Sequence, residues 1–164
     1  MSGPGVVSDV VDVYVFRRDS DGVRLLQLRR ANEPYAGTWQ PVMGRVEDGE
    51  RAARAAVREL GEETGLGAGD NKLIGMWRLD GVHPYYMASR DAIVMSVRFA
   101  CEVAPGWEPV LDESHDDARW VVIERAEGAF MWPNQRASIR DLVEGILKPE
   151  SACREALRVD PANP

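Results

Sequence analysis

The segment from Glu50 to Thr64 constrains the fold of this chain more than any other. It is rich in alanine, lacks proline and is followed by Gly65, so it predicts one helix that ends at this glycine. Four residues recur at helical spacing and form one face toward a core: Ala53, Val57, Leu60 and Thr64. Such a helix buries only one side, so another layer of secondary structure has to cover that side.

The segments around this helix supply the missing layer. Runs rich in β-branched and aromatic residues predict strands at residues 10–16, 23–30, 72–79, 92–103 and 118–123. Residues 137–147 have the spacing of an amphipathic helix. The order of strands, helix, strands and helix predicts an α/β (α+β) fold with a mixed sheet against helices.

We expect one domain, because 164 residues are enough to bury a core without disulfides. It should cover residues 8–148, with a flexible N-terminus over residues 1–7 and a C-terminal tail over residues 149–164. Cys101 and Cys153 are far apart in the chain and predict two free thiols in a reducing cytoplasm.

Charge and hydropathy limit the partners. The net charge of −7 argues against broad nucleic-acid binding, which needs a basic surface. No apolar run is long enough to cross a bilayer, and the start of the sequence does not have the pattern of a signal peptide. An acidic protein can still bind a small phosphorylated substrate when divalent cations lie between the two sets of negative charge.

Three carboxylates crowd the predicted helix at positions 59, 62 and 63. Like charges at this spacing repel by roughly 0.2–0.5 kcal/mol per pair, even at a solvated surface. Glu59, Glu62 and Glu63 therefore form either a solvated acidic face or a set of oxygen ligands for Mg²⁺ or Mn²⁺. A loop carbonyl before the helix could complete such a set, and Arg58 could orient one of the carboxylates.

The spacing of this stretch resembles the signature of the Nudix hydrolase family, G-x5-E-x7-R-E-U-x-E-E-x-G-U, where U is a bulky apolar residue. Every specified position matches: Gly44, Glu50, Arg58, Glu59, Leu60, Glu62, Glu63, Gly65 and Leu66. The resemblance implies a Nudix α/β/α sandwich that hydrolyses a nucleoside diphosphate linked to a further group.

The resemblance also implies roles for the matching residues. Glu59, Glu62 and Glu63, with the carbonyl of Gly44, are expected to bind Mg²⁺ or Mn²⁺. Glu59, Glu62 and Arg58 are expected to take part in catalysis, and the family's glutamate at position 50 supports the ligands. Homodimers are common in the family, so a homodimer is also expected.

Two further stretches are similar to the dihydroneopterin triphosphate/dATP pyrophosphohydrolase branch of this family. They are residues 39–50 (WQPVMGRVEDGE) and residues 131–139 (MWPNQRASI). A nucleoside triphosphate or pterin triphosphate is therefore the expected substrate. The alternatives are a dinucleoside polyphosphate hydrolase, an oxidised-nucleotide hydrolase and a non-catalytic nucleotide-sensing module.

The general base is open at this point. Many relatives have a Glu-His pair before a strand that carries a tryptophan, but this chain has Ser114 before His115. Glu113 or Asp116 could replace the missing glutamate, and we favour Glu113 as the catalytic residue.

Four residues outside the signature are candidates for substrate binding: Arg29, Arg30, Tyr86 and Asn134. The two arginines could reach phosphate, Tyr86 could stack on a ring and Asn134 could contact the ring edge. Plain surface positions for the arginines, and a helix N-cap for Asn134, are the simpler alternatives.

Overall fold

The computed structural model describes residues 3–164. Its central helix, α1 (Ala52–Thr64), has the predicted position and ends at Gly65, whose φ of 74° is the left-handed conformation that glycine adopts without strain. Leu60 and Thr64 are buried as predicted. Ala53 and Val57 are only partly buried against the same core, because the fully buried side is rotated toward Ala55 and Ala56.

The main sheet has the strand order β10-β3-β2-β9-β6-β11, with β4 paired to β3 and β5 paired to β2. The neighbours β2 and β9 are parallel and the other pairs are antiparallel, so the sheet is mixed as predicted. Its strands are β2 (Val10–Asp19), β3 (Gly22–Arg30), β4 (Trp39–Gln40), β5 (Val42–Arg45), β6 (Leu73–Arg78), β9 (Val97–Val103), β10 (His115–Val122) and β11 (Arg158–Val159).

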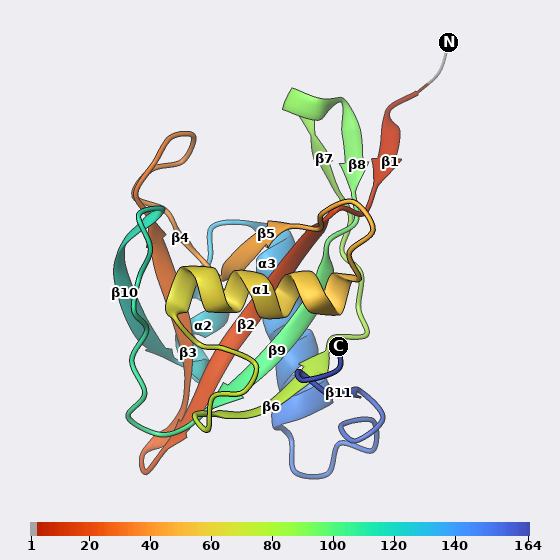
Figure 1. Cartoon of the computed structure of the whole chain (residues 1–164). Coiled ribbons are helices and arrows are strands. Elements are labelled where there is room, and N and C mark those ends of the chain that lie inside the picture. The colour runs from red at the N-terminus through yellow and green to blue at the C-terminus, as the bar shows by residue number, and fades with distance from the viewer. Residues whose placement is uncertain (1–2) are drawn as a thin grey trace.

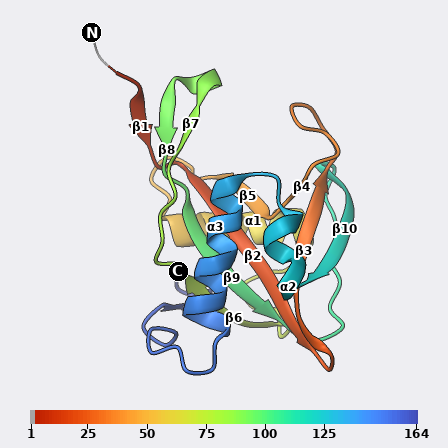
Figure 2. The ribbon, with the colours of Figure 1, turned by 180° about the vertical axis from the view of Figure 1, so that it is seen from behind.

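Helices cover both faces of this sheet. In Figure 1 the helix α1 crosses the near face, and in Figure 2 the helices α2 (Ile123–Ala129) and α3 (Pro133–Leu142) cover the opposite face. A π-helical turn, η2 (Val143–Leu147), continues α3. Two separate clusters of buried apolar residues lie on the two faces. The predicted α/β/α sandwich is therefore confirmed.

A second, three-stranded sheet extends from the body with the order β1-β8-β7 (Figure 1). It contains β1 (Gly5–Val7), β7 (Tyr85–Met87) and β8 (Ala92–Val94), with a 3-10 turn, η1 (Ala88–Arg90), between the last two. The single strand predicted at residues 92–103 is wrong, because the chain leaves one sheet and enters the other between β8 and β9. None of the predicted strands covers β7.

Each chain end contains a short strand that the sequence did not predict. Residues 1 and 2 lie outside the described part of the chain, but Gly5–Val7 pairs with β8 as a strand. In the tail, Arg158 and Val159 pair with β6, and Leu157 is 4% exposed. The backbone hydrogen bonds of these two short strands order the segments.

The structure also bears on the two cysteines and on the predicted lack of a membrane-spanning segment. Cys101 is buried and Cys153 exposed, and both thiols are free. None of the helices within residues 3–164 combines the length and the apolar character needed to cross a membrane.

Candidate active site

The carboxylates of α1 lie against the strand β5, and Gly44 makes this close approach possible. Gly44 pairs with Val11 in the sheet, which places its α-carbon over the side chain of Glu59. A β-carbon at position 44 would overlap the Glu59 carboxylate. Only glycine leaves room for this carboxylate against the backbone, so the predicted metal residues Gly44 and Glu59 do meet.

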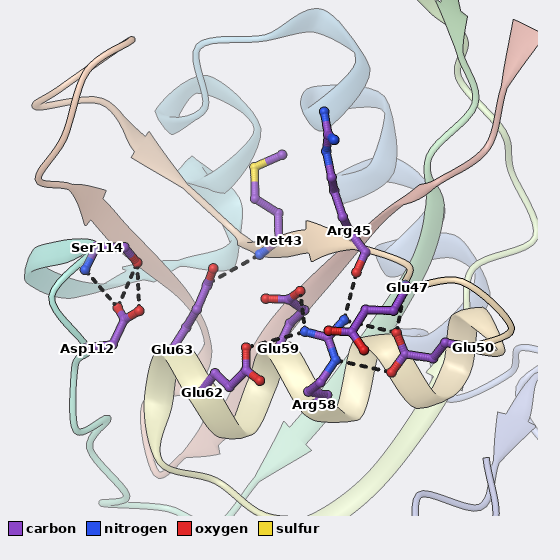
Figure 3. Close-up of polar contacts among 10 residues, drawn as sticks. All are labelled: Met43, Arg45, Glu47, Glu50, Arg58, Glu59, Glu62, Glu63, Asp112 and Ser114. Atoms are coloured by element: carbon purple, nitrogen blue, oxygen red, sulfur yellow. Dashed lines mark hydrogen bonds and ion pairs between the residues drawn. The ribbon is translucent and has the colours of Figure 1, made fainter.

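Arg58 is the centre of the polar contacts in Figure 3. Its guanidinium donates to both oxygens of Glu50 at 3.1 and 3.0 Å, to Glu59 at 2.7 Å and to Glu62 at 3.3 Å. A further bond of 2.7 Å reaches the carbonyl oxygen of Arg45. The guanidinium lowers the pKa of Glu50 through these hydrogen bonds. The Arg58 guanidinium thus joins the helix to the end of β5, and its positive charge offsets the repulsion among the carboxylates.

Glu63 does not share the solvated face that its spacing predicts. It is 7% exposed and its Oε2 accepts a hydrogen bond from the Met43 N–H at 3.3 Å. Burial raises the pKa of Glu63 to about 9; the Met43 bond opposes this shift, and the charges of Glu59, Asp112 and Glu62 add to it. The Glu62 side chain, in contrast, is 57% exposed. The helix therefore buries the carboxyl of Glu63 and exposes that of its neighbour Glu62.

Replacing Glu63 with glutamine is expected to stabilise the protein at alkaline pH in EDTA. In the unfolded chain Glu63 has the ordinary glutamate pKa of 4.5, whereas in the folded protein its pKa is about 9, so the unfolded chain binds fewer protons between these values. The free energy of unfolding of the wild type therefore falls as pH rises, by an amount on the order of a few kcal/mol. Glutamine does not titrate, so the variant lacks this fall in the free energy of unfolding with rising pH.

Urea unfolding at about pH 5 and about pH 8.5 measures this effect. The advantage of Glu63→Gln over the wild type should be larger at the higher pH. An equal difference at both pH values would contradict a buried carboxyl at position 63.

Within residues 3–164, neither predicted general base forms a hydrogen bond with a signature carboxylate. Glu113 is exposed, and its one hydrogen bond uses the backbone carbonyl, which accepts from Asn32 at 3.4 Å. Asp116 accepts a hydrogen bond of 2.7 Å from Arg29. A third carboxylate, that of Asp112, is linked to Glu63 through His115, whose Nδ1 lies 3.0 Å from Asp112 Oδ1 and whose Nε2 lies 3.9 Å from Glu63 Oε2. The sequence analysis missed Asp112, because the spacing of residues in a loop does not predict the conformation of that loop.

The other three candidates for substrate binding have separate surroundings. Arg30 donates to the carbonyl of Asn32 at 2.9 Å, at the same end of β3 as Arg29. Tyr86 lies on the small sheet and donates to Asp91 at 2.9 Å, away from the signature helix. Asn134 is the second residue of α3, whose N-cap is Trp132, so the N-cap alternative for Asn134 is wrong.

An exposed aromatic pair that the sequence did not single out lies near Asn134. The rings of Tyr35 and Trp132 are 5.5 Å apart in an edge-to-face arrangement. The two side chains are 57% and 43% exposed, although both are large and apolar. Tyr35 has a left-handed φ of 73°, which is unfavourable for a bulky residue, and Thr38 holds its carbonyl with a hydrogen bond of 2.7 Å.

A buried ion pair was also missed. Arg98 is 1% exposed, Asp12 is 3% exposed, and the Arg98 Nε lies 3.4 Å from the Asp12 Oδ2. Asp12 is opposite Met43 in the neighbouring strand, one residue from Gly44. Burial raises the pKa of Asp12 against the opposing charge of Arg98. Asp12 and Arg98 are charged residues within the apolar strands predicted at 10–16 and 92–103, and this pattern could have indicated the buried pair.

The donor set fits a divalent cation. Three carboxylates and a carbonyl are the oxygen ligands that Mg²⁺ and Mn²⁺ prefer, and Gly44 lets the Glu59 carboxylate lie against the backbone. Within residues 3–164, no three acidic, histidine or cysteine side chains converge closely enough to bind one ion as they stand. The contacts explain this, because Glu59 and Glu62 bind Arg58 while Glu63 binds Met43. Rotation of the exposed Glu62 side chain is enough to change its partner.

Two surface hollows lie elsewhere. One of about 480 Å³ is formed by β6 and the C-terminal tail, and one of about 430 Å³ is formed by β10 and α2. Neither is lined by a residue of the signature.

Known proteins share the sequence and the fold. The family model described as NUDIX domain matches residues 8–142. An octanoyltransferase of Myxococcus xanthus is 35% identical over 132 residues, which are 79% of this chain and 35% of that protein. The chain thus spans about a third of the length of that relative. A dihydroneopterin triphosphate diphosphatase of Haemophilus influenzae is 29% identical over 121 residues, which are 70% of this chain and 73% of that protein.

Among solved structures, the dihydroneopterin triphosphate pyrophosphohydrolase of E. coli matches with a TM-score of 0.69. The match covers 84% of this chain and 97% of that chain at 22% identity. This likeness shows the shared fold.

Proposed function

Because this chain belongs to the Nudix hydrolase family, we propose that it is a Mg²⁺- or Mn²⁺-dependent pyrophosphohydrolase. Its substrate is a nucleoside triphosphate or a related compound, and its products are pyrophosphate and a monophosphate. The observation that carries this proposal is the group of carboxylates around Arg58, packed against the backbone of Gly44.

The residues of the chain have distinct tasks in this reaction. Glu59, Glu62, Glu63 and the Gly44 carbonyl would hold the cation, which when bound neutralises the diphosphate and lowers the pKa of a water. Glu50 keeps the Arg58 guanidinium in place, and Arg58 in turn orients Glu59 and Glu62. The Met43 N–H orients Glu63.

The aromatic pair supports a substrate with a planar ring. Tyr35 and Trp132 expose ring surface at the junction of the β3–β4 loop and the start of α3. A nucleobase or a pterin stacks on such a surface, and Asn134 lies two residues after Trp132 to contact its edge. Dihydroneopterin triphosphate and dATP are the proposed substrates.

Trp132→Ala is expected to raise KM for this substrate by roughly tenfold, because stacking of one base contributes about 1–3 kcal/mol. The value of kcat should change less, since stacking acts on the ring of the substrate and not on the reacting phosphate. Trp132→Phe keeps a stacking surface and is the matched control. A KM for Trp132→Ala equal to that of the wild type would remove the aromatic pair from the proposed site.

A panel of substrates with chromatography of both products tests the proposed function. The panel contains dihydroneopterin triphosphate, dATP, an oxidised purine nucleoside triphosphate and diadenosine tetraphosphate. We expect pyrophosphate from the first two compounds with added Mg²⁺ and no hydrolysis in EDTA. Preferential hydrolysis of the third or fourth compound would identify the alternative substrate classes, and hydrolysis in EDTA would refute the metal-dependent mechanism.

The turnover of the preferred substrate should rise with pH. A cation that binds Glu63 has to displace the proton that burial retains there, so metal affinity increases as this proton becomes easier to remove.

A further inference from the structure

The loop before β10 carries a carboxylate to the signature helix. The Val110 N–H donates to the Thr64 carbonyl at 2.9 Å, which attaches the loop to the end of α1. The Ala31 N–H donates to the Ser114 carbonyl at 2.8 Å, which attaches it to the end of β3. Asp112 lies between these two attachments in the chain, and it contacts His115 Nδ1 at 3.0 Å, while the Nε2 of the same imidazole lies 3.9 Å from Glu63 Oε2. The position of Asp112 is therefore set by the sandwich itself.

The Asp112 carboxylate is held by two neighbours. The Ser114 hydroxyl lies 2.8 Å from each of its oxygens, and the Ser114 N–H donates to Oδ1 at 3.3 Å. The His115 Nδ1 lies 3.0 Å from the same Oδ1. Because Ser114 has a single hydroxyl proton, Oδ2 keeps capacity to accept another.

The histidine tautomer follows from its second nitrogen. The His115 Nε2 lies 3.1 Å from the side-chain nitrogen of Gln40, which can only donate. Nε2 therefore accepts, and Nδ1 carries the proton that is donated to Asp112. His115 is 5% exposed, so the imidazole is fixed on both sides. An imidazole held in this way orients the carboxylate that it contacts.

The other nearby carboxylates are already engaged. Glu50, Glu59 and Glu62 all accept from Arg58, and Glu63 accepts from the Met43 N–H. The Asp112 side chain is 32% exposed, so water reaches it. Burial alone would raise the pKa of Asp112, but the hydrogen bonds from Ser114 and His115 outweigh burial and keep the carboxyl ionised.

We propose that Asp112 is a catalytic residue that accepts a proton from the attacking water, and that Ser114 and His115 are its positioning residues. This inference rests on the proposed function. In the step, the water oxygen forms a bond to phosphorus while one of its O–H bonds breaks, and the proton passes to the Asp112 carboxylate. The bond from that phosphorus to the bridging oxygen breaks, and its electron pair leaves with the released phosphate group.

Asp112→Asn and its neighbour Glu113→Gln make a matched pair, because each replaces one carboxylate with the corresponding amide. The asparagine oxygen still accepts from Ser114 and His115, so the loop keeps its conformation. With the preferred substrate of the panel, kcat of Asp112→Asn should fall at least about 100-fold, in the range of general-base catalysis. Glu113→Gln should stay within about twofold of the wild type.

Binding of Mn²⁺, followed by electron paramagnetic resonance, separates this role from metal ligation. The dissociation constant of Asp112→Asn for Mn²⁺ should stay within about threefold of the wild type. Three results would overturn the assignment: nearly normal turnover in Asp112→Asn, an equal loss in Glu113→Gln, or lost Mn²⁺ binding in Asp112→Asn. A wild type that binds Mn²⁺ but hydrolyses nothing in the panel refutes the proposed function, and the assignment falls with it. An active wild type with an unaffected Asp112→Asn refutes the assignment alone.

Discussion

Glu59→Gln is expected to lower kcat by about 100- to 1,000-fold, equivalent to about 3–4 kcal/mol of transition-state stabilisation. Glutamine has the size of glutamate but carries no charge for a cation. It also weakens the hydrogen bond of 2.7 Å from Arg58, which is strong because both partners are charged. Steady-state hydrolysis of the preferred substrate with Mg²⁺ and with Mn²⁺ measures the loss.

Glu124→Gln is the matched control for this variant. Glu124 is an exposed residue in the first turn of α2, and the same chemical change there should leave kcat unaltered. The Mn²⁺ dissociation constant of Glu59→Gln should rise together with the loss of kcat. Full activity of Glu59→Gln with both metals would refute a ligand role for this carboxylate.

Gly44→Ala is expected to be nearly as inactive, for a steric reason. The added β-carbon would be placed 1.9 Å from the Glu59 carboxyl carbon, so this carboxylate has to move. The end of a glutamate side chain is flexible, and Gly44 does not have a left-handed φ that alanine would strain. We therefore expect a loss of kcat of about 100-fold with a destabilisation of only about 1 kcal/mol, since the displacement affects the site more than the fold.

Gly67→Ala is the control for this second variant, because nothing lies within 4 Å of a β-carbon at position 67. Thermal unfolding and kcat are measured on both proteins. A melting temperature of Gly44→Ala that falls as far as its activity would mean that the glycine serves the fold. Unchanged activity would mean that catalysis does not require the Glu59 carboxylate to lie beside β5.

The conformation of α1 could be predicted from the sequence because its determinants are local. Helical spacing brings Arg58, Glu59 and Glu62 together, and Gly65 ends the helix at the expected residue. The hairpin of β2 and β3 is equally local, since a short turn joins its two strands. The same locality explains why the signature could be found without a structure.

The burial of Glu63 could not be predicted in this way. Spacing places Glu62 and Glu63 next to each other, but the contact between α1 and β5 decides which of them is covered. The loop before β10 is a similar case. Glu113, Asp116 and Asp112 are equivalent in charge, and the fold of the loop decides that Asp112 contacts His115, whose Nε2 lies 3.9 Å from Glu63.

The sequence by itself determined the helix and the residues of the signature on it, because their spacing follows from helix geometry over a few turns. The resemblance of that signature to the family's then implied the family and the sandwich. The tertiary structure decided what surrounds these residues. Gln40 meets His115 across 75 residues of chain, and the Tyr35 and Trp132 rings also come from segments that are far apart in sequence. Such contacts depend on how strands and helices pack, and packing responds to the whole chain at once.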